Sequence, residues 1–141
     1  KTSDVDDSPT LFASSGVTAV STGPMAALYG AFAPSGRVLH VVGVGAEQAG
    51  VIQSFARDPS IGVLAKLGEV SSAGLGPSHA AVDPAGHHLL VVNLRSDQVC
   101  SFPLSAAGLP ATPSMCLHTG ARPHQARFSP DGRFVFVPNR D

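Results

Sequence analysis

The sequence carries little charge, and positive and negative residues nearly cancel. Charged residues make up 13% of its 141 residues, the net charge is −1, and there is no block of basic residues. A surface that binds nucleic acid or an anionic membrane needs clustered positive charge. No run approaches the ~20 apolar residues of a membrane span either. We therefore expect neither nucleic acid nor a membrane as a partner.

Cysteine is equally scarce. Cys100 and Cys116 are the only two, and their spacing fits no Cys-x-x-Cys metal or redox site. Each lies in an apolar, strand-like run, which favours two thiols in the core, because a free cysteine packs like a small hydrophobe. A disulfide between neighbouring strands of one blade stays open as the alternative.

Several chemical signatures are missing as well. No His-Glu-x-x-His motif, no His pair at ligand spacing and no Asp-rich calcium loop occurs, so the sequence predicts no metal site. Gly43-Val44-Gly45 lacks the third glycine of a dinucleotide-binding loop, and the Gly-x-Ser-x-Gly motif of serine hydrolases is absent. We expect a protein without a cofactor.

The first residues carry no recognisable targeting signal. Residues 1–7 lack the basic region and the apolar stretch of a secretory signal, which predicts a cytoplasmic protein. The sequence starts without Met, so a leader removed from the mature chain stays open as the alternative.

What the chain does contain is a repeat. In residues 122–137, two extended runs (125–128 and 133–137) flank a Ser-Pro-Asp-Gly turn, in which Pro130 presets its φ and Gly132 allows a positive φ. Similar turns carry Pro34 and Pro84, so the turn prolines are separated by 50 and then 46 residues. Repeats of about 40–50 residues with four short strands are typical of β-propeller blades.

The predicted fold class is therefore all-β, a partial β-propeller of four-stranded antiparallel blades. Hydrophobic residues make up 43% of the chain, which favours strands buried on both faces. No window has the apolar period of an amphipathic helix, which excludes a solenoid of helix pairs. Expected strands span residues 29–33, 38–44, 51–55 and 64–70 in one repeat, and 79–82, 89–93, 99–104 and 114–117 in the next.

The repeat also divides the chain. Residues 27–76 and 77–122 are predicted to be full blades, and 123–141 the first half of a third. Residues 1–26 form an N-terminal segment whose apolar runs suit strands of a preceding blade. Because a propeller ring closes with about 4–8 blades, we expect a fragment of about three blades, with the missing blades in the parent chain.

Two stretches resemble a known family. Gly76-Pro77-Ser78-His79 leads into a turn and then Leu-Val-Val-Asn at positions 90–93, and Pro123-His124 leads into the Pro-Asp-Gly-Arg turn at 130–133. Together they resemble the lactonase-type seven-bladed β-propellers, which include propeller 6-phosphogluconolactonases and fungal carboxymuconate cyclases. The resemblance implies a lactone hydrolase or lactonizing cyclase that acts on a small anionic lactone or sugar acid without a cofactor.

The alignment of the turn prolines indicates where such chemistry would lie. Lactone hydrolysis needs a base for water, donors for the oxyanion and a cation for an anionic substrate. His124 starts an expected innermost strand and, with the family resemblance, is the predicted catalytic residue, as base or oxyanion donor. Arg122 and His79 are the predicted substrate-binding residues. The structural alternatives are a hydrogen bond between blades for His124, a place in the core between blades for His79, and a solvated loop position for Arg122.

The competing functional class is a non-enzymatic β-propeller that serves as an interaction scaffold. It stays open because a fold does not imply a function.

Overall fold

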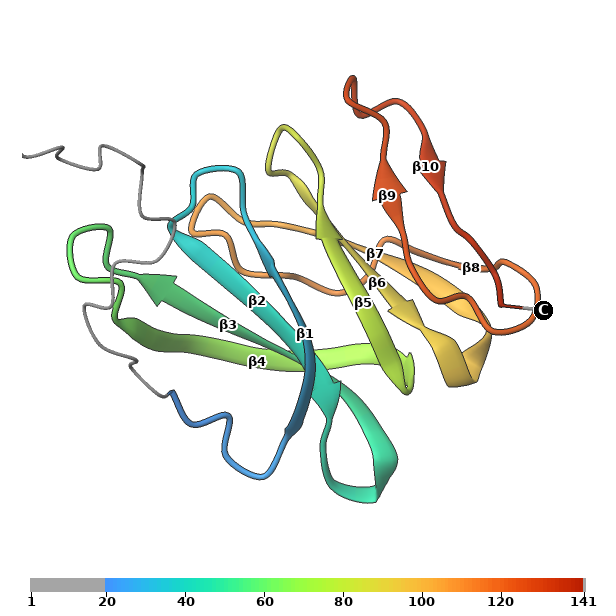
Figure 1. Ribbon diagram of the computed structural model, residues 1–141, viewed down its shortest axis with the longest axis horizontal. Helices are drawn as coiled ribbons and strands as arrows, with labels where there is room; N and C mark the ends of the chain where they lie inside the picture. The colour runs from blue at the N-terminus through green and yellow to red at the C-terminus, as the bar shows by residue number, and fades with distance from the viewer. Residues whose placement is uncertain (1–19, 141) are drawn as a thin grey trace, which may run out of the picture.

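The computed structural model describes residues 20–140, which form two complete four-stranded sheets and a hairpin (Figure 1). The first blade contains β1 (Ala26–Phe32), β2 (Val38–Val44), β3 (Ala49–Arg57) and β4 (Leu64–Leu75). The second blade contains β5 (Pro77–Val82), β6 (His88–Asn93), β7 (Gln98–Pro103) and β8 (Met115–His118). The hairpin is β9 (Arg127–Phe128) and β10 (Val135–Phe136), and short 3-10 turns η1 (Ala46–Gln48) and η2 (Leu94–Ser96) link β2 to β3 and β6 to β7.

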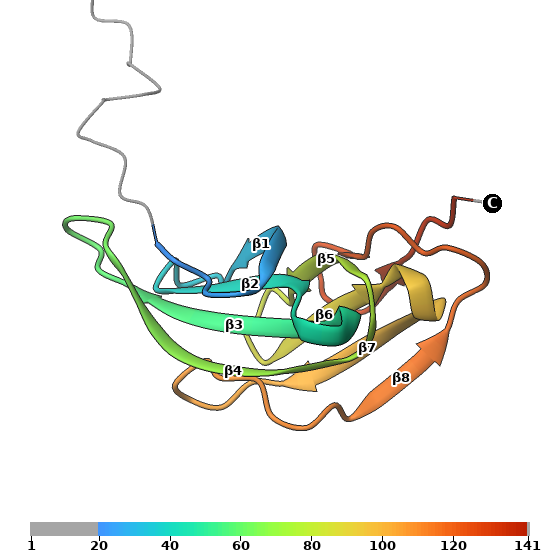
Figure 2. The same ribbon diagram turned by 90° about the horizontal axis from the view of Figure 1, so that it is seen from below.

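Each sheet follows the chain order, and every pairing between neighbouring strands is antiparallel. The two sheets fan out beside each other, and the hairpin follows on the far side of the second sheet (Figures 1 and 2). The all-β fold and the four-stranded antiparallel blades are therefore confirmed.

The repeated turns close in the same way in all three units. The backbone N–H of the residue before the turn proline bonds the carbonyl five residues on, as in Ala33 to Val38, Asp83 to His88 and Ser129 to Phe134. The turn glycines Gly36, Gly86 and Gly132 all have positive φ, between 66° and 76°. These local bonds explain why a short Pro-x-Gly pattern is enough to locate each hairpin.

Strand β6 shows how the blades pack. Its residues Leu89 and Val91 belong to a core shared with the first blade, which contributes Val42 and Ile52. The alternate residues Leu90 and Val92 instead pack on the other side, with Ala126 next to the hairpin. Because successive side chains of a strand point to opposite faces, a continuous apolar run serves two interfaces at once.

Side-chain hydrogen bonds from asparagines, here called polar clamps, join neighbouring units near the ends of their strands. Asn93, fully buried, donates from Nδ2 to the Ser72 carbonyl at 2.8 Å and accepts from Ser72 Oγ at 2.7 Å. Asn139 donates to the carbonyl of Thr119 at the next interface. The clamp recurs because Asn93 ends the second strand of its blade and Asn139 follows the second strand of the hairpin, and each reaches the last strand of the blade before or the residue after it.

The hairpin strands are shorter than the expected runs 125–128 and 133–137. β9 and β10 pair only at Arg127–Phe136 and Phe128–Val135. The backbone before β9 turns toward the second blade instead, where the Ala126 N–H reaches His79. In the described chain no third strand pairs with β10, which leaves it at a sheet edge.

The prediction of two core thiols is wrong. Cys100 and Cys116 form a disulfide, with their Cα atoms 4.1 Å apart. The register of β7 and β8 places the two residues directly opposite each other, Cys100 buried and Cys116 exposed. The pairing depends on this register, which the spacing of the cysteines does not reveal.

Most of the predicted N-terminal segment, residues 1–26, lies outside the described residues. Its described end contains Met25, which is buried, and the first residue of β1. Within residues 20–140, no helix is long and apolar enough to cross a membrane.

Candidate functional site

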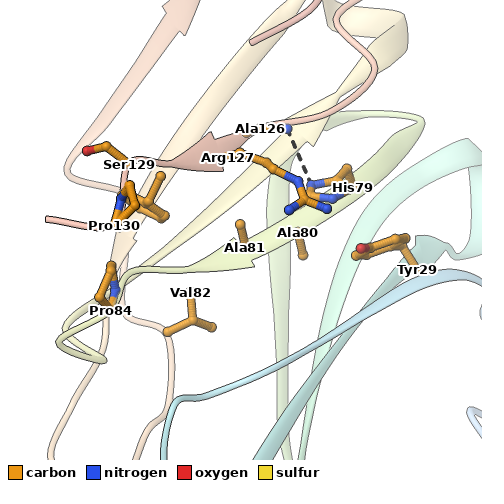
Figure 3. Close-up of a pocket in the computed structure, with 11 residues that line it drawn as sticks. Tyr29, His79, Ala80, Ala81, Val82, Pro84, Ala126, Arg127, Ser129 and Pro130 are labelled. Carbon is orange, nitrogen blue, oxygen red and sulfur yellow. Dashed lines mark hydrogen bonds between the residues drawn. The ribbon is translucent and has the colours of Figure 1, made fainter. Parts of the chain in front are cut away.

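The first strands of the three repeats lie on the same side of the fan and line an open groove (Figure 3). The groove encloses about 360 Å³. β1 contributes Tyr29, β5 contributes residues 79–82, and the chain around β9 contributes residues 126–130. Side chains about 50 residues apart in sequence are thus brought together by the stacking of the blades.

His79 lies at the centre of this arrangement and is only 6% exposed. The Tyr29 ring packs against it, with ring centroids 4.2 Å apart and an angle of 35° between the planes. On the other side, the Ala126 N–H donates a hydrogen bond to His79 Nδ1 at 3.4 Å. Because Nδ1 accepts this bond, the proton of the neutral ring lies on Nε2, which is left as a donor.

The surroundings of His79 keep it neutral. Burial lowers the pKa of its imidazole below the ordinary 6.5, and the positive charges of Arg127 and then His124 lower it further. A cationic ring is disfavoured both by the loss of water and by like charges nearby. At neutral pH, His79 is therefore suited to donate a hydrogen bond from Nε2, and poorly suited to accept a proton.

His124 has a different environment. Its side chain is exposed and is not among the groove-lining residues, although its charge acts on His79. Its backbone is held on both sides, since its N–H donates to the Pro138 carbonyl at 3.1 Å and its carbonyl accepts from Ser78 Oγ at 3.3 Å. The structure thus fixes the main chain at His124 and leaves the imidazole accessible to solvent.

Arg122 has an unusual backbone conformation. Its φ is +55°, a region that side chains with a Cβ rarely occupy. The equivalent residue of the previous repeat is Gly76, with φ +58°. Both carbonyls accept the same backbone bond, from Leu94 N at 3.0 Å for Gly76 and from Arg140 N at 3.1 Å for Arg122.

The Arg122 N–H is also held, by Asp97 Oδ1 at 2.7 Å. A left-handed conformation costs an ordinary residue about 1–2 kcal/mol that glycine avoids. An arginine at a site built for glycine is an outlier of the kind that accumulates at functional sites.

The structure adds two residues that the sequence analysis did not propose, Tyr29 and Arg127. Tyr29 is aligned with His79 by the turn prolines, so the alignment held a signal for it. Arg127 had none, because only the approach of β9 to β5 brings its charge to His79. Arg127 is exposed and points toward His79 in the groove (Figure 3).

Two other polar features lie elsewhere. His40 is fully buried and bonds Ser54 Oγ through Nδ1 at 2.9 Å, and burial lowers its pKa to about 4. In the described part of the chain, no group of three or more His, Cys, Asp or Glu side chains is placed to hold a metal ion.

Comparisons with known proteins agree with this architecture. A family model described as "Lactonase, 7-bladed beta-propeller" matches residues 14–140. No curated protein sequence matches the chain.

Solved structures extend the comparison. The chain is similar to the periplasmic gluconolactonase PpgL of Pseudomonas aeruginosa, with 27% identity and a TM-score of 0.72 over 86% of this chain and 38% of that one. It is also similar to a putative 6-phosphogluconolactonase of Bacteroides uniformis, with 25% identity and a TM-score of 0.67 over 74% of this chain and 33% of that one. The chain thus spans between a third and two fifths of the length of these relatives.

Proposed function

The chain belongs to the lactonase family of seven-bladed β-propellers, and on that premise we propose that its protein hydrolyses a small anionic sugar lactone without a cofactor. The observation that carries the proposal is that His79 and Arg127 line one groove, and that Arg127 and then His124 lie close enough to lower the pKa of His79. The gluconolactonase and 6-phosphogluconolactonase named among the similar structures support this substrate class.

In the proposed reaction, His124 takes a proton from water as the water oxygen attacks the lactone carbonyl. The ring C–O bond then breaks, and the same proton passes to the leaving ring oxygen, so that the product is a hydroxy acid. His124 suits this role because its imidazole is exposed while its backbone is held at both ends. A positioned acid–base group of this kind contributes about 10²–10⁴-fold.

His79 has the complementary role. Its neutral ring, with Nδ1 occupied by the Ala126 N–H, presents the Nε2 proton to the oxygen on which negative charge develops. Arg122 pairs with the carboxylate or phosphate of the substrate, which would account for an arginine at a glycine-type position. The same groups would also serve the reverse reaction, the closure of a lactone ring. The experiment therefore measures both hydrolysis and ring closure.

The proposal is tested on the full-length protein with 6-phosphogluconolactone and gluconolactone, and with a muconate for ring closure. His124→Ala should lower kcat/KM at least about 100-fold, the low end for loss of an acid–base group. His118→Ala, which removes an exposed histidine on the outer strand β8, is the matched control and should leave turnover unchanged.

Full activity of His124→Ala would refute its role as the base. Failure of the wild-type protein to act on any of these compounds would favour a non-enzymatic scaffold.

The compartment is a second part of the proposal. Export from the cytoplasm is the alternative to the cytoplasmic location predicted from residues 1–7. It is supported by the Cys100–Cys116 disulfide, because disulfides persist mainly in oxidising compartments. The similar PpgL is described as periplasmic, which also supports export. We propose export, and fractionation of cells that express the full-length protein decides between the two.

A further inference from the structure

A second and larger groove lies on the turn side of the first two blades, away from His124. It encloses about 620 Å³ between the β1–β2 turn with the nearby ends of β2, β3 and β4 on one wall, and the turns of the second blade on the other. Both walls come from the two four-stranded blades, so the groove does not depend on the β9–β10 hairpin. Its lining includes Arg37, Val38, Arg57, Leu67, Leu104 and Ser105.

The two arginines are close neighbours, since Arg37 comes directly before β2 and Arg57 ends its partner strand β3. Arg57 N–H donates to the Arg37 carbonyl at 2.7 Å, next to the Val38–Ala56 pair of β2 and β3. Like charges at facing positions of neighbouring strands destabilise a sheet. No acidic residue lines the groove within residues 20–140, and the single salt bridge described there joins Lys66 to Glu69.

Neither guanidinium is saturated with hydrogen bonds. Arg57 Nη1 donates to the Gly36 carbonyl at 3.2 Å, and within the described chain the Arg37 side chain makes no hydrogen bond or ion pair. Each guanidinium carries a planar fork of N–H donors that suits a carboxylate or phosphate, and both arginines line the same groove.

The second blade shows that the fold does not need this pair. There the same backbone bond joins Leu104 N–H to the His87 carbonyl, also at 2.7 Å. A leucine and a histidine therefore occupy the places of Arg57 and Arg37, and the hairpin closes equally well. The arginine pair is a property of the first blade alone among the two complete blades.

The groove is also pre-formed. The turn that makes its far wall is closed by bonds from Gly108 N to the Ser105 carbonyl at 2.8 Å and from Ser105 N to the Leu109 carbonyl at 2.9 Å. This turn lies so close to β2 that a side chain at Gly108 would meet Val38 Cγ2 at 3.0 Å. A rigid site with apolar walls and a few convergent charges is typical of small-molecule sites.

We propose that this groove binds a small organic anion, whose carboxylate or phosphate is held by Arg37 and Arg57 and whose hydrocarbon part packs on Val38, Leu67 and Leu104. The site is distinct from the proposed lactone site, since the two grooves share no lining residue and are separated where Pro84 of one is followed by Ala85 of the other. Its ligand is therefore an effector or a second substrate-sized anion, not the lactone undergoing hydrolysis.

The test uses the full-length protein and three probes: inorganic phosphate, phenyl phosphate and benzoate. Calorimetric titration should show saturable binding of phenyl phosphate or benzoate, whichever headgroup the site prefers, and weaker binding of phosphate, which lacks the apolar part. Arg37→Gln and Arg57→Gln should each weaken binding about tenfold or more, because each removes a charge-assisted hydrogen bond.

The matched control is Arg133→Gln. Arg133 follows the turn glycine of the third unit as Arg37 follows that of the first, but it stacks on Phe134 outside the groove. The Arg133→Gln variant should bind the probes as the wild type does. Arg37→Gln alone keeps the test valid if Arg57→Gln perturbs folding, because the Arg37 side chain makes no bond within the described chain.

Absence of saturable binding by the wild-type protein, or an equal loss in Arg133→Gln, would overturn the proposal. Lactone turnover of Arg37→Gln in the absence of probe should match the wild type, so a failure here is separate from a failure of the proposed enzymatic function.

Discussion

Arg122 offers a test in which stability and function should move in opposite directions. Its φ of +55° matches the +58° of Gly76, the equivalent glycine one repeat earlier. If the arginine is kept for its charge, replacing it with glycine should relieve the backbone and still damage the enzyme. We compare Arg122→Gly, Arg122→Ala and Arg122→Lys in the full-length protein.

The expected stability difference follows from the backbone. Glycine avoids a left-handed penalty of about 1–2 kcal/mol, and loses about 0.5–1 kcal/mol through the greater freedom of its unfolded chain. Arg122→Gly should therefore be about 0.5–1 kcal/mol more stable than Arg122→Ala. Every contact of the guanidinium is lost in both variants, so the difference between them isolates the backbone.

The expected loss of function is the same for both variants. A hydrogen bond to a charged group contributes about 1.5–3 kcal/mol, which corresponds to about 10- to 100-fold in kcat/KM for a phosphorylated lactone. Neutral gluconolactone offers no anion to Arg122 and should be turned over almost normally. Arg122→Lys, which keeps the charge without the fork, should recover part of the activity.

Denaturant unfolding gives the stability, and initial rates with the two lactones give the selectivity. Gly76→Ala serves as the mirror control, because a Cβ there would meet Arg95 Cγ at 2.7 Å and should destabilise the protein. If Arg122→Gly is less stable than Arg122→Ala, and both lactones are affected equally, then Arg122 has a structural role and the reasoning fails.

Three further predictions concern the scaffold. His40 has its pKa lowered from the ordinary 6.5 to about 4, so its contribution is complete above pH 6.5 and is lost as the pH falls toward 4. That loss should reach about 3 kcal/mol in acid unfolding curves, and His40→Gln should flatten it, whereas an unchanged slope would contradict the assignment. Asn93→Leu removes the acceptor and the donor that Asn93 offers to Ser72, and should cost about 2–4 kcal/mol in denaturant unfolding; a loss below ~1 kcal/mol would show that the clamp is dispensable. Reduction of the Cys100–Cys116 disulfide, which closes a loop with a sequence separation of 16, should cost about 3 kcal/mol, and a Cys100→Ser, Cys116→Ser double variant should lose the sensitivity to reductant.

Part of the candidate site was accessible from the sequence. The alignment on Pro34, Pro84 and Pro130 placed His79 on a first strand and His124 at the entry of one; in the structure His79 lies in β5 and His124 lies three residues before β9. It did not reveal that His79 is clamped between Tyr29 and the Ala126 N–H, because that contact joins three repeats and depends on how closely their first strands approach.

The sequence by itself determined the repeat, the strand pattern and the turns, because each is a local property. A proline with a nearby glycine closes a hairpin wherever it occurs, and the unbroken apolar run of residues 89–92 already implies burial on both faces. No helical alternative competed with these signals, so every expected strand of the two full repeats is present, with bounds that shift by a few residues.

Only the tertiary structure decided the features that depend on register and on the packing of one blade against the next. The disulfide required Cys100 to face Cys116 across β7 and β8, the φ of Arg122 followed from its bonds to Asp97 and Arg140, and the arginine groove required two blades in contact. Such features join residues whose separation in sequence carries no information about their distance in space, and the chemistry of this protein lies among them.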